Sequence, residues 1–302
     1  MAGVLDGRVA LIAGASKNIG KGIALEVAAS GALTYVTARS LEDVPGQIAS
    51  LRRTVAEIEA LGGKAVPVVC DHRDDAQVEA VFDQIRAEQG RLDLVVNVVS
   101  PDFNAMVGVP FWELPFQHID DCLDIGPRSN YVTTALAARI MVPQGSGLVV
   151  NISSHGAHRY LVSVPYGVGK AGIDKVTQDT AFELRTHGVA AVSLWPGLVL
   201  TEGLLAGAVE AEDGRMLLHG LDVRVGETPR FNGRAVVALA SDPKVLERTG
   251  GSYFSAVLAR EYGFTEDDGH LPPEKPHRVL AEMGEDIPDF WRIIEPAASD
   301  AV

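Results

Sequence analysis

Short apolar runs alternate along the chain with longer segments in which apolar residues recur at helical spacing. The runs are nearly continuous, as in strands whose two faces are both covered by helices. Strands are predicted at residues 9–13, 34–38, 65–70, 94–98, 148–152 and 190–195, and a weaker one near Tyr253. Helices are predicted at residues 20–30, 44–61, 74–89, 116–142, 166–187 and 230–241. This order predicts the α/β class: a single-domain, Rossmann-like, doubly wound parallel sheet of about seven strands with helices on both faces.

Two irregular stretches interrupt the alternation. Residues 99–115 follow the fourth predicted strand, and residues 197–228 follow the sixth. Loops at the carboxyl ends of parallel strands form the ligand crevice of such a sheet, so both stretches are predicted to be walls or lids of a pocket. Residues 1–260 are predicted to form one domain. Residues 261–302 are predicted to form a C-terminal tail that packs, around its Phe290-Trp291 pair, on the domain or on a neighbouring subunit.

Composition and charge narrow the classes of partner. Acidic residues outnumber basic ones by 40 to 26, and the formal net charge of -14 would repel nucleic-acid phosphates and anionic lipid headgroups. The two cysteines, Cys70 and Cys122, lie in apolar runs and are predicted to be reduced core thiols, with neither a disulfide nor a metal site. We see no signal peptide and no apolar run of the roughly 20 residues that cross a bilayer. The sequence therefore predicts a soluble, cytoplasmic protein that binds neither nucleic acid nor membrane.

A glycine-rich turn joins the first predicted strand to the first predicted helix. It reads Ala-Gly-Ala-Ser-Lys-Asn-Ile-Gly-Lys-Gly from Ala13 to Gly22. Glycine at such a turn lets backbone amides approach a pyrophosphate, and the N-terminus of the helix favours its negative charge. A tight turn that merely needs flexible glycine is the weaker interpretation. The predicted phosphate-binding residues are Gly14, Ser16, Lys17, Asn18, Ile19 and Gly20.

Arg39 stands at the end of the second predicted strand. A dinucleotide-binding fold that prefers NAD usually has a carboxylate there for the ribose 2′-hydroxyl, whereas arginine can bind a 2′-phosphate. Lys17, in the loop beside the same ribose, adds a second positive charge. The two residues favour NADP(H) over NAD(H) as the cofactor. The alternative is that Arg39 is only an exposed charge at a strand end.

Tyr166 and Lys170 lie four residues apart at the start of a predicted helix, so they share one face. A free tyrosine has a pKa of about 10, too high for acid–base chemistry near neutral pH, and a nearby cation lowers it. This spacing alone arises by chance on many amphipathic helices. Here Ser153 and Ser154 precede Tyr166 by 13 and 12 residues at the end of a predicted strand, and the glycine-rich turn lies upstream. That combination favours a catalytic interpretation.

Together these segments resemble the short-chain dehydrogenase/reductase family over roughly residues 7–260. The family's loop reads Thr-Gly-x-x-x-Gly-x-Gly, of which Gly14 and Gly20 match. Ala13 replaces the threonine, and Asn18 replaces the middle glycine. Because asparagine tolerates positive φ better than most residues, we expect the turn to survive.

The resemblance implies a role for each matching residue. Tyr166 would be the general acid and base, Lys170 would bind the nicotinamide ribose, and Ser154 would hold the substrate oxygen. Counting residues back from Tyr166 leaves Ser153 open as the alternative. Asp71 would contact the adenine ring. The cofactor-binding residues implied outside the loop are Arg39, Asp71, His72, Asn97, Tyr166, Lys170, Pro196, Gly197, Val199 and Thr201.

The resemblance also implies a reaction and an assembly. Hydride would pass between the nicotinamide and a carbonyl or secondary alcohol while Tyr166 exchanges the proton. In the family, the helices matching 116–142 and 166–187 form the subunit contact, so a homodimer or homotetramer is implied. Mostly aromatic side chains in the loops expected over the nicotinamide favour an apolar small-molecule substrate, although ordinary loop packing would explain any one of them. They are Phe103, Met106, Phe111, Trp112, His155, His158 and Tyr160.

Gly126 departs from the family pattern. Most members carry an asparagine there, which kinks the helix and holds a water that connects to the lysine. Gly126 followed by Pro127 would still kink the helix but offers no side chain, and Asn130 one turn later is a candidate substitute. Residues 124–201 resemble one animal subgroup that also has this glycine, which favours an active enzyme. The alternative is an NADP(H)-binding protein without turnover, with a structural or regulatory role.

Overall fold

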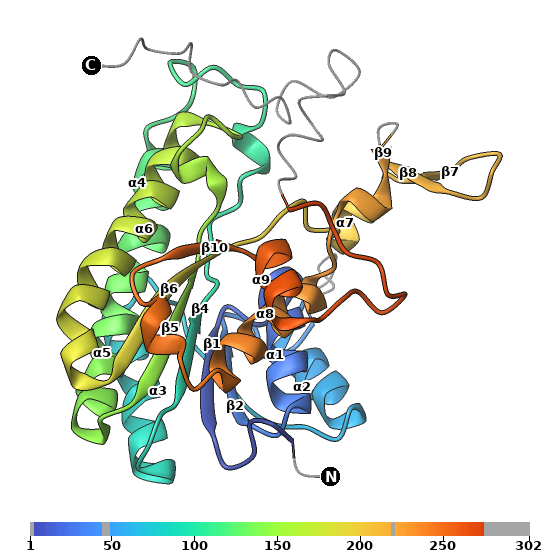
Figure 1. Ribbon diagram of the computed structural model, residues 1–302. Helices are drawn as coiled ribbons and strands as arrows, with labels where there is room; N and C mark the ends of the chain where they lie inside the picture. The colour runs from blue at the N-terminus through green and yellow to red at the C-terminus, as the bar shows by residue number, and fades with distance from the viewer. Residues whose placement is uncertain (1–2, 44–48, 219–220, 275–302) are drawn as a thin grey trace.

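The computed structural model, which describes residues 3–43, 49–218 and 221–274, contains a seven-stranded parallel sheet (Figure 1). The strands lie in the order β10, β6, β5, β4, β1, β2, β3. The order reverses at β1, whose neighbours are β4 and β2, so the predicted doubly wound fold is confirmed. The strands are β1 (Val9–Ala13), β2 (Leu33–Ala38), β3 (Lys64–Val69), β4 (Leu94–Asn97), β5 (Gly147–Ile152), β6 (Val189–Trp195) and β10 (Ser252–Phe254).

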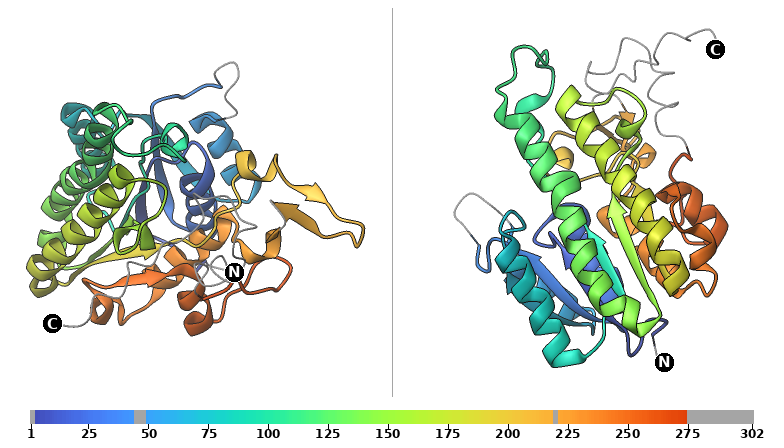
Figure 2. Two further views of the ribbon diagram at one scale, coloured as in Figure 1. Left: turned by 90° about the horizontal axis from the view of Figure 1, so that it is seen from above. Right: turned by 90° about the vertical axis from the view of Figure 1, so that its left-hand side faces the viewer.

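Helices cover both faces of this sheet, as the two turned views show (Figure 2). Each strand sends alternate side chains to opposite faces, so Ile12 packs in the core beneath α1 and α8, and Leu11 packs in the core beneath α3, α5 and α6. Both side chains are fully buried. The helices are α1 (Asn18–Ala29), α2 (Leu51–Ala60), α3 (Asp75–Gln89), α4 (Gln117–Leu123), α5 (Ser129–Gln144), α6 (Val164–Leu184), α8 (Pro229–Ser241) and α9 (Ser255–Tyr262).

Two predicted helices differ from the observed ones. The helix expected over 116–142 is divided by a π-helical segment, Asp124–Arg128, in which Gly126 has the non-helical angles φ -82 and ψ -109. This is the kink expected from glycine followed by proline. The helix expected from residue 44 begins instead at Leu51, because the Ser50 side chain accepts the Arg53 backbone N–H at 3.3 Å and caps it there. Residues 44–48 lie outside the described residues.

The long connection between β6 and α8 contains structure that the sequence pattern did not predict. After α7 (Glu202–Leu205), the short strands β7 (Val209–Glu210), β8 (Met216–Leu218) and β9 (Leu221–Asp222) form an antiparallel sheet that projects from the body (Figure 1). Helix α9 was likewise not predicted. The expected anchor at residues 290–291 lies outside the described residues. Among the helices that the structure describes, none is both long and apolar enough to cross a membrane.

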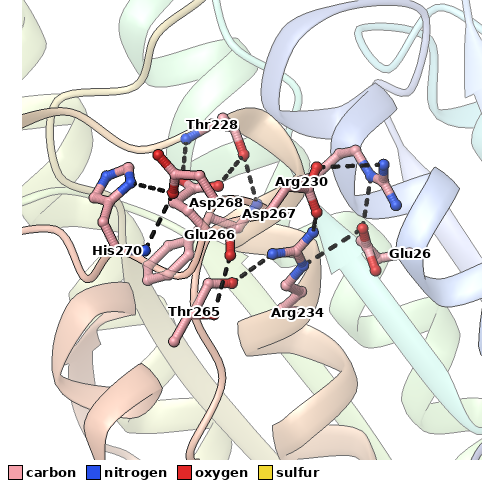
Figure 3. A network of polar contacts seen from close by, with 10 residues as sticks. Glu26, Thr228, Arg230, Arg234, Thr265, Glu266, Asp267, Asp268 and His270 are labelled. Atoms are coloured by element: carbon pink, nitrogen blue, oxygen red, sulfur yellow. Dashed lines mark hydrogen bonds and ion pairs between the residues drawn. The ribbon is translucent and has the colours of Figure 1, made fainter. Parts of the chain in front are cut away.

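A network of polar contacts holds the segment after α9 against the start of α8 (Figure 3). The Glu266 carboxylate, which is buried, accepts the Thr228 backbone N–H at 2.6 Å and its hydroxyl at 2.8 Å. Arg234 donates to the Thr265 carbonyl and the Asp267 carboxylate, and Arg230 donates to Glu26 of α1 at 2.6 Å. A carboxylate beside the first turn of a helix is stabilised by the free backbone N–H groups there. The network therefore fixes α8 and the end of the 197–228 connection to the domain.

Candidate active site

Tyr166 and Ser154 are brought together at the carboxyl edge of the sheet. Ser163 caps α6 by accepting the Tyr166 backbone N–H at 3.3 Å, so Tyr166 lies in the first turn of that helix. Its hydroxyl donates to Ser154 Oγ at 2.8 Å, and Ser154, just after β5, also accepts the Gly156 N–H at 3.0 Å. Both side chains are buried. The phenol and the serine hydroxyl therefore form one polar unit.

Lys170 lies one turn after Tyr166 on the same face of α6. Its ammonium donates to the Ile152 carbonyl at 3.1 Å and lies 5.7 Å from the centre of the Tyr166 ring. The two serines that the sequence left as alternatives are used differently. Ser153 Oγ donates to the Lys170 carbonyl at 3.1 Å, whereas Ser154 contacts the phenol. The geometry therefore points to Ser154 as the serine of the site.

Burial dominates the electrostatics of this pair. It raises the pKa of Tyr166 to about 12, although the hydrogen bond with Ser154 acts in the opposite direction. The sequence suggested a lowered value, and the direction differs because removing the phenolate from water outweighs the other effects. Burial also lowers the pKa of Lys170 to about 8, against the attraction of the Asp174 carboxylate. The pKa values of both side chains therefore differ strongly from those in water.

Close packing fixes the Tyr166 ring. Phe103, from the irregular stretch after β4, meets the ring edge to face with centroids 4.7 Å apart. A Cβ at Gly156 would lie only 2.6 Å from Tyr166 Cε1, so only glycine fits there. A narrow cavity between these elements is lined by Val99, Phe103, Cys122, Gly126, Tyr166 and Lys170, among others. Sequence reasoning missed Gly156, because its need for glycine arises from a side chain ten residues away.

The glycine-rich turn has the shape needed for a phosphate. Gly14 has φ +92, and a Cβ at Gly20 would lie 2.0 Å from the Gly14 carbonyl oxygen. Asn18 has φ +50, so the substitution for the family glycine keeps the left-handed turn, as expected. Among the described residues, no side chain caps the start of α1, so the backbone N–H groups of its first turn remain available to an anion. Ser16 and Ile19 lie in the same turn.

The other residues expected to hold the adenosine half lie along one edge of the sheet. Arg39, just after β2, and Lys17 are both exposed. Asp71 follows β3 and accepts the Arg73 backbone N–H at 3.0 Å. His72 is buried, its Nε2 lies 2.8 Å from Thr37 Oγ1, and burial lowers its pKa to about 4, so it is neutral near pH 7. The ends of the first three strands therefore bring these side chains to the same edge of the sheet.

Asn97 and the segment after β6 complete the predicted set. Asn97 Nδ2 donates to Asn151 Oδ1 at 2.7 Å, so its side chain is used within the sheet. Pro196, Gly197 and Val199 follow β6, and Thr201 caps α7 by accepting the Leu204 N–H at 3.3 Å.

The side chains that were expected to line the substrate pocket differ in their burial. Met106 is buried beside Phe103, but Phe111, Trp112 and Tyr160 are exposed, His155 is buried beside Phe254, and His158 packs on Trp195.

Glu227 holds the segment after β6 and was not predicted from the sequence. Its backbone pairs with Leu198 and Leu200 through two 2.8 Å hydrogen bonds. Its buried carboxyl accepts the Ser255 hydroxyl at 2.7 Å and receives further hydrogen bonds from the Gly197 N–H and Asn232. Burial nevertheless raises the pKa of Glu227 to about 7. This single residue therefore joins the Gly197 segment to the base of α8 and to the start of α9.

Comparisons with known proteins agree with this arrangement. Residues 8–208 match the family model of the short chain dehydrogenases, and the chain belongs to that family. Within it, the chain is similar to Dehydrogenase/reductase SDR family member 1 of Mus musculus, with 42% identity over 276 residues that cover 89% of this chain and 86% of the relative. The resemblance to an animal subgroup is thus confirmed.

Solved structures of the same family share the fold. A short chain dehydrogenase from Mycobacterium thermoresistibile is 26% identical, with a TM-score of 0.74 over 89% of this chain and 92% of its own. A metagenomic short-chain oxidoreductase in complex with NADP is 25% identical, with a TM-score of 0.66 over 83% of this chain and 97% of its own. The chain is therefore a short-chain oxidoreductase, a family that binds nicotinamide cofactors and small-molecule substrates.

The raised pKa of Glu227 predicts a specific dependence of stability on pH. The unfolded group ionises near 4.5 and the folded one near 7, so its contribution to stability is full below pH 4.5 and is lost as the pH rises through 7. At about 1.4 kcal/mol per pKa unit, the loss is about 3 kcal/mol. Urea unfolding at pH 5 and pH 8 measures it: Glu227→Gln should lose less free energy of unfolding between these values than the wild type.

The exposed Glu59 of α2 provides the matched control. Glu59→Gln should keep the wild-type difference between pH 5 and pH 8. An identical difference in all three proteins would contradict the assignment of a raised pKa to Glu227.

Proposed function

We propose that this chain is an NADP(H)-dependent oxidoreductase that interconverts a carbonyl and a secondary alcohol, with Tyr166 as the general acid and base. The single observation that carries the proposal is the 2.8 Å hydrogen bond between the buried Tyr166 hydroxyl and Ser154 Oγ. A substrate oxygen placed between these hydroxyls would meet both a proton donor and a second polar group. The cofactor, when bound, supplies or accepts the hydride.

The residues around the pair have distinct tasks in this proposal. Ser154 holds the substrate oxygen, and its own orientation is set by the Gly156 N–H at 3.0 Å. Lys170 binds the nicotinamide ribose and brings its positive charge close to the phenol. Burial raises the pKa of Tyr166 to about 12, and the hydrogen bond with Ser154 acts against this rise. Phe103, edge to face with Tyr166, presents an apolar wall that supports an apolar substrate.

The cofactor assignment rests on the edge of the sheet beyond the glycine-rich turn. The exposed guanidinium of Arg39 stands where a carboxylate would favour the 2′-hydroxyl of NAD, and the exposed ammonium of Lys17 in the glycine-rich turn adds a second positive charge. We therefore propose NADP(H) as the cofactor, held by the α1 N-terminus, the β2 and β3 ends and the segment after β6.

The assembly is proposed from the outer surfaces of α5 and α6. Tyr131, Val168 and Phe182 are 58%, 45% and 70% exposed on these helices. Large apolar side chains gathered on two adjacent helices are typical of a surface that a second subunit covers. We propose that copies of the chain pair through α5 and α6. The assembly is either the resulting homodimer or a homotetramer that contains this contact.

Replacing Tyr166 by phenylalanine tests the reaction. The variant removes the only atom of the ring that exchanges a proton, so turnover should fall by at least about 10²-fold, the lower range for general acid–base catalysis. Absorbance at 340 nm over a panel of apolar ketones and aldehydes measures turnover, and NADPH fluorescence titration should show binding within about twofold of wild type. A wild-type protein that binds NADPH and turns over none of the panel would favour cofactor binding without catalysis.

Replacing Arg39 by alanine tests the cofactor preference. Loss of a charge-assisted hydrogen bond to a 2′-phosphate costs about 1.5–3 kcal/mol, so the Kd for NADPH should rise about 10- to 100-fold. The Kd for NADH should stay almost unchanged, because NADH lacks that phosphate. Arg86→Ala, an exposed arginine of α3 paired with Asp83, is the control and should affect neither. An equal rise in the Kd for NADPH and for NADH would contradict the assignment.

Sedimentation velocity tests the assembly. The wild type should sediment with two or four times the mass of one chain. Phe182→Asp should shift the protein toward the monomer, because burying an unpaired carboxylate in an apolar contact costs free energy. Leu61→Asp, an exposed apolar residue at the end of α2, is the control. A wild type that sediments only as a monomer would refute the proposed contact.

A further inference from the structure

Asp174 is a buried acid of α6 that the mechanism above does not use. It lies one turn after Lys170 on the same helix, so the two side chains share a face. Its side chain is 5% exposed. One oxygen, Oδ1, accepts the Trp195 Nε1–H at 3.2 Å. The other, Oδ2, is buried without a hydrogen-bond partner among the described residues.

A carboxylate in this position needs a compensating charge. Burying an ionised carboxylate with a single neutral hydrogen bond is costly, and buried charges in proteins are normally paired. His158 Nε2 lies 4.0 Å from Oδ2, but the His158 side chain is 64% exposed and reaches Asp174 from the solvent side. Lys170 is the buried cation that shares its helix face with Asp174. Asp174 is also the acid whose attraction raises the pKa of Lys170 against burial.

We propose that Asp174 is a positioning residue that keeps Lys170 protonated and thereby sets the pH range in which the Tyr166–Lys170 pair works. Trp195 holds the carboxylate in place from the end of β6, where its ring meets Phe254 edge to face and His158 at a tilt. This inference rests on the proposed function for its kinetic consequence. The electrostatic interaction between Asp174 and Lys170 is independent of whether the protein catalyses a reaction.

The other groups facing Lys170 do not supply a negative charge. Cys122 of α4 lies nearby, but burial raises the pKa of its thiol to about 11, so it is neutral near pH 7. Tyr166, on the same helix, is protonated in that range for the same reason. Gly126 lines the same cavity and has no side chain, and the Asn130 amide donates to the Gly126 carbonyl at 2.8 Å. Asp174 is therefore the anionic group that acts on the ammonium within the described part of the chain.

The first experiment measures the ionisation of Lys170 directly. Reductive methylation with formaldehyde modifies only the neutral amine, so its rate against pH, read on the Lys170 peptide by mass spectrometry, gives a midpoint without cofactor or turnover. Asp174→Asn keeps the acceptor for Trp195 and removes the charge. The midpoint should fall by about one pH unit, because a nearby opposite charge typically shifts a pKa by one unit or more.

Two further variants complete the test. Asp179→Asn, an exposed acid of α6 paired with Lys175 at 2.7 Å, should leave the midpoint unchanged. His158→Lys places a fixed positive charge beside Asp174 at an exposed position and should also lower the midpoint, even if Asp174→Asn does not fold. An unchanged Lys170 midpoint in Asp174→Asn, or in His158→Lys where only that variant folds, overturns the proposal.

The second experiment connects the charge to the reaction. In the reductase direction the alkaline limb of kcat/KM against pH should move to lower pH in Asp174→Asn, because removing a negative charge makes neighbouring groups lose protons more easily. A uniform loss of activity at every pH, with the methylation midpoint unchanged, would assign Asp174 to packing. A shifted midpoint in a protein without turnover would support the electrostatic interaction and count against the proposed function alone.

Discussion

A buried chain of hydrogen bonds fixes α6 on the sheet, and the site depends on it. Asn97 of β4 donates to Asn151 of β5 at 2.7 Å, and Asn151 donates to Thr177 of α6 at 2.8 Å. Ser193 of β6 donates to the same threonine at 3.0 Å. A fully buried polar chain permits few alternative arrangements, because each unpaired group would cost free energy. The helix that carries Tyr166 and Lys170 is thereby locked to three strands, with its first turn at their carboxyl ends.

The parts of the fold that depend on local patterns could be predicted from the sequence. Six of the seven strands appear within a residue of their predicted bounds, the seventh includes Tyr253 as expected, and the turn around Asn18 adopts the positive φ that asparagine tolerates. The parts that depend on distant partners could not. Glu227 gains its role from Gly197 and Ser255, thirty and twenty-eight residues away in the sequence, and neither spacing forms a recognisable motif. The small sheet β7–β9 has strands too short for any periodicity to reveal.

The same distinction applies to the chemistry of the site. The four-residue spacing of Tyr166 and Lys170 predicts that they share a face, which the structure bears out. It does not predict that both are buried, and burial reverses the expected direction of the Tyr166 pKa. A nearby cation lowers the pKa of a tyrosine, whereas burial of the phenol raises it, so the net shift depends on which effect is larger. That balance is a property of the packed site, to which Phe103, Gly156 and Cys122 all contribute.

Gly126, where the chain departs from the family pattern, bears on the role of Asp174. Glycine at 126 allows the backbone angles φ -82 and ψ -109 at the break between α4 and α5, and leaves the wall beside Lys170 without a polar side chain. Burial lowers the pKa of Lys170 to about 8, and the attraction of the Asp174 carboxylate acts against this fall. A carboxylate one turn along the same helix thereby stabilises the charge of an ammonium whose hydrogen bond goes to the Ile152 carbonyl. The loss of a polar group at one wall is thus compatible with a charged lysine, provided that Asp174 and the Trp195 that holds it are both present.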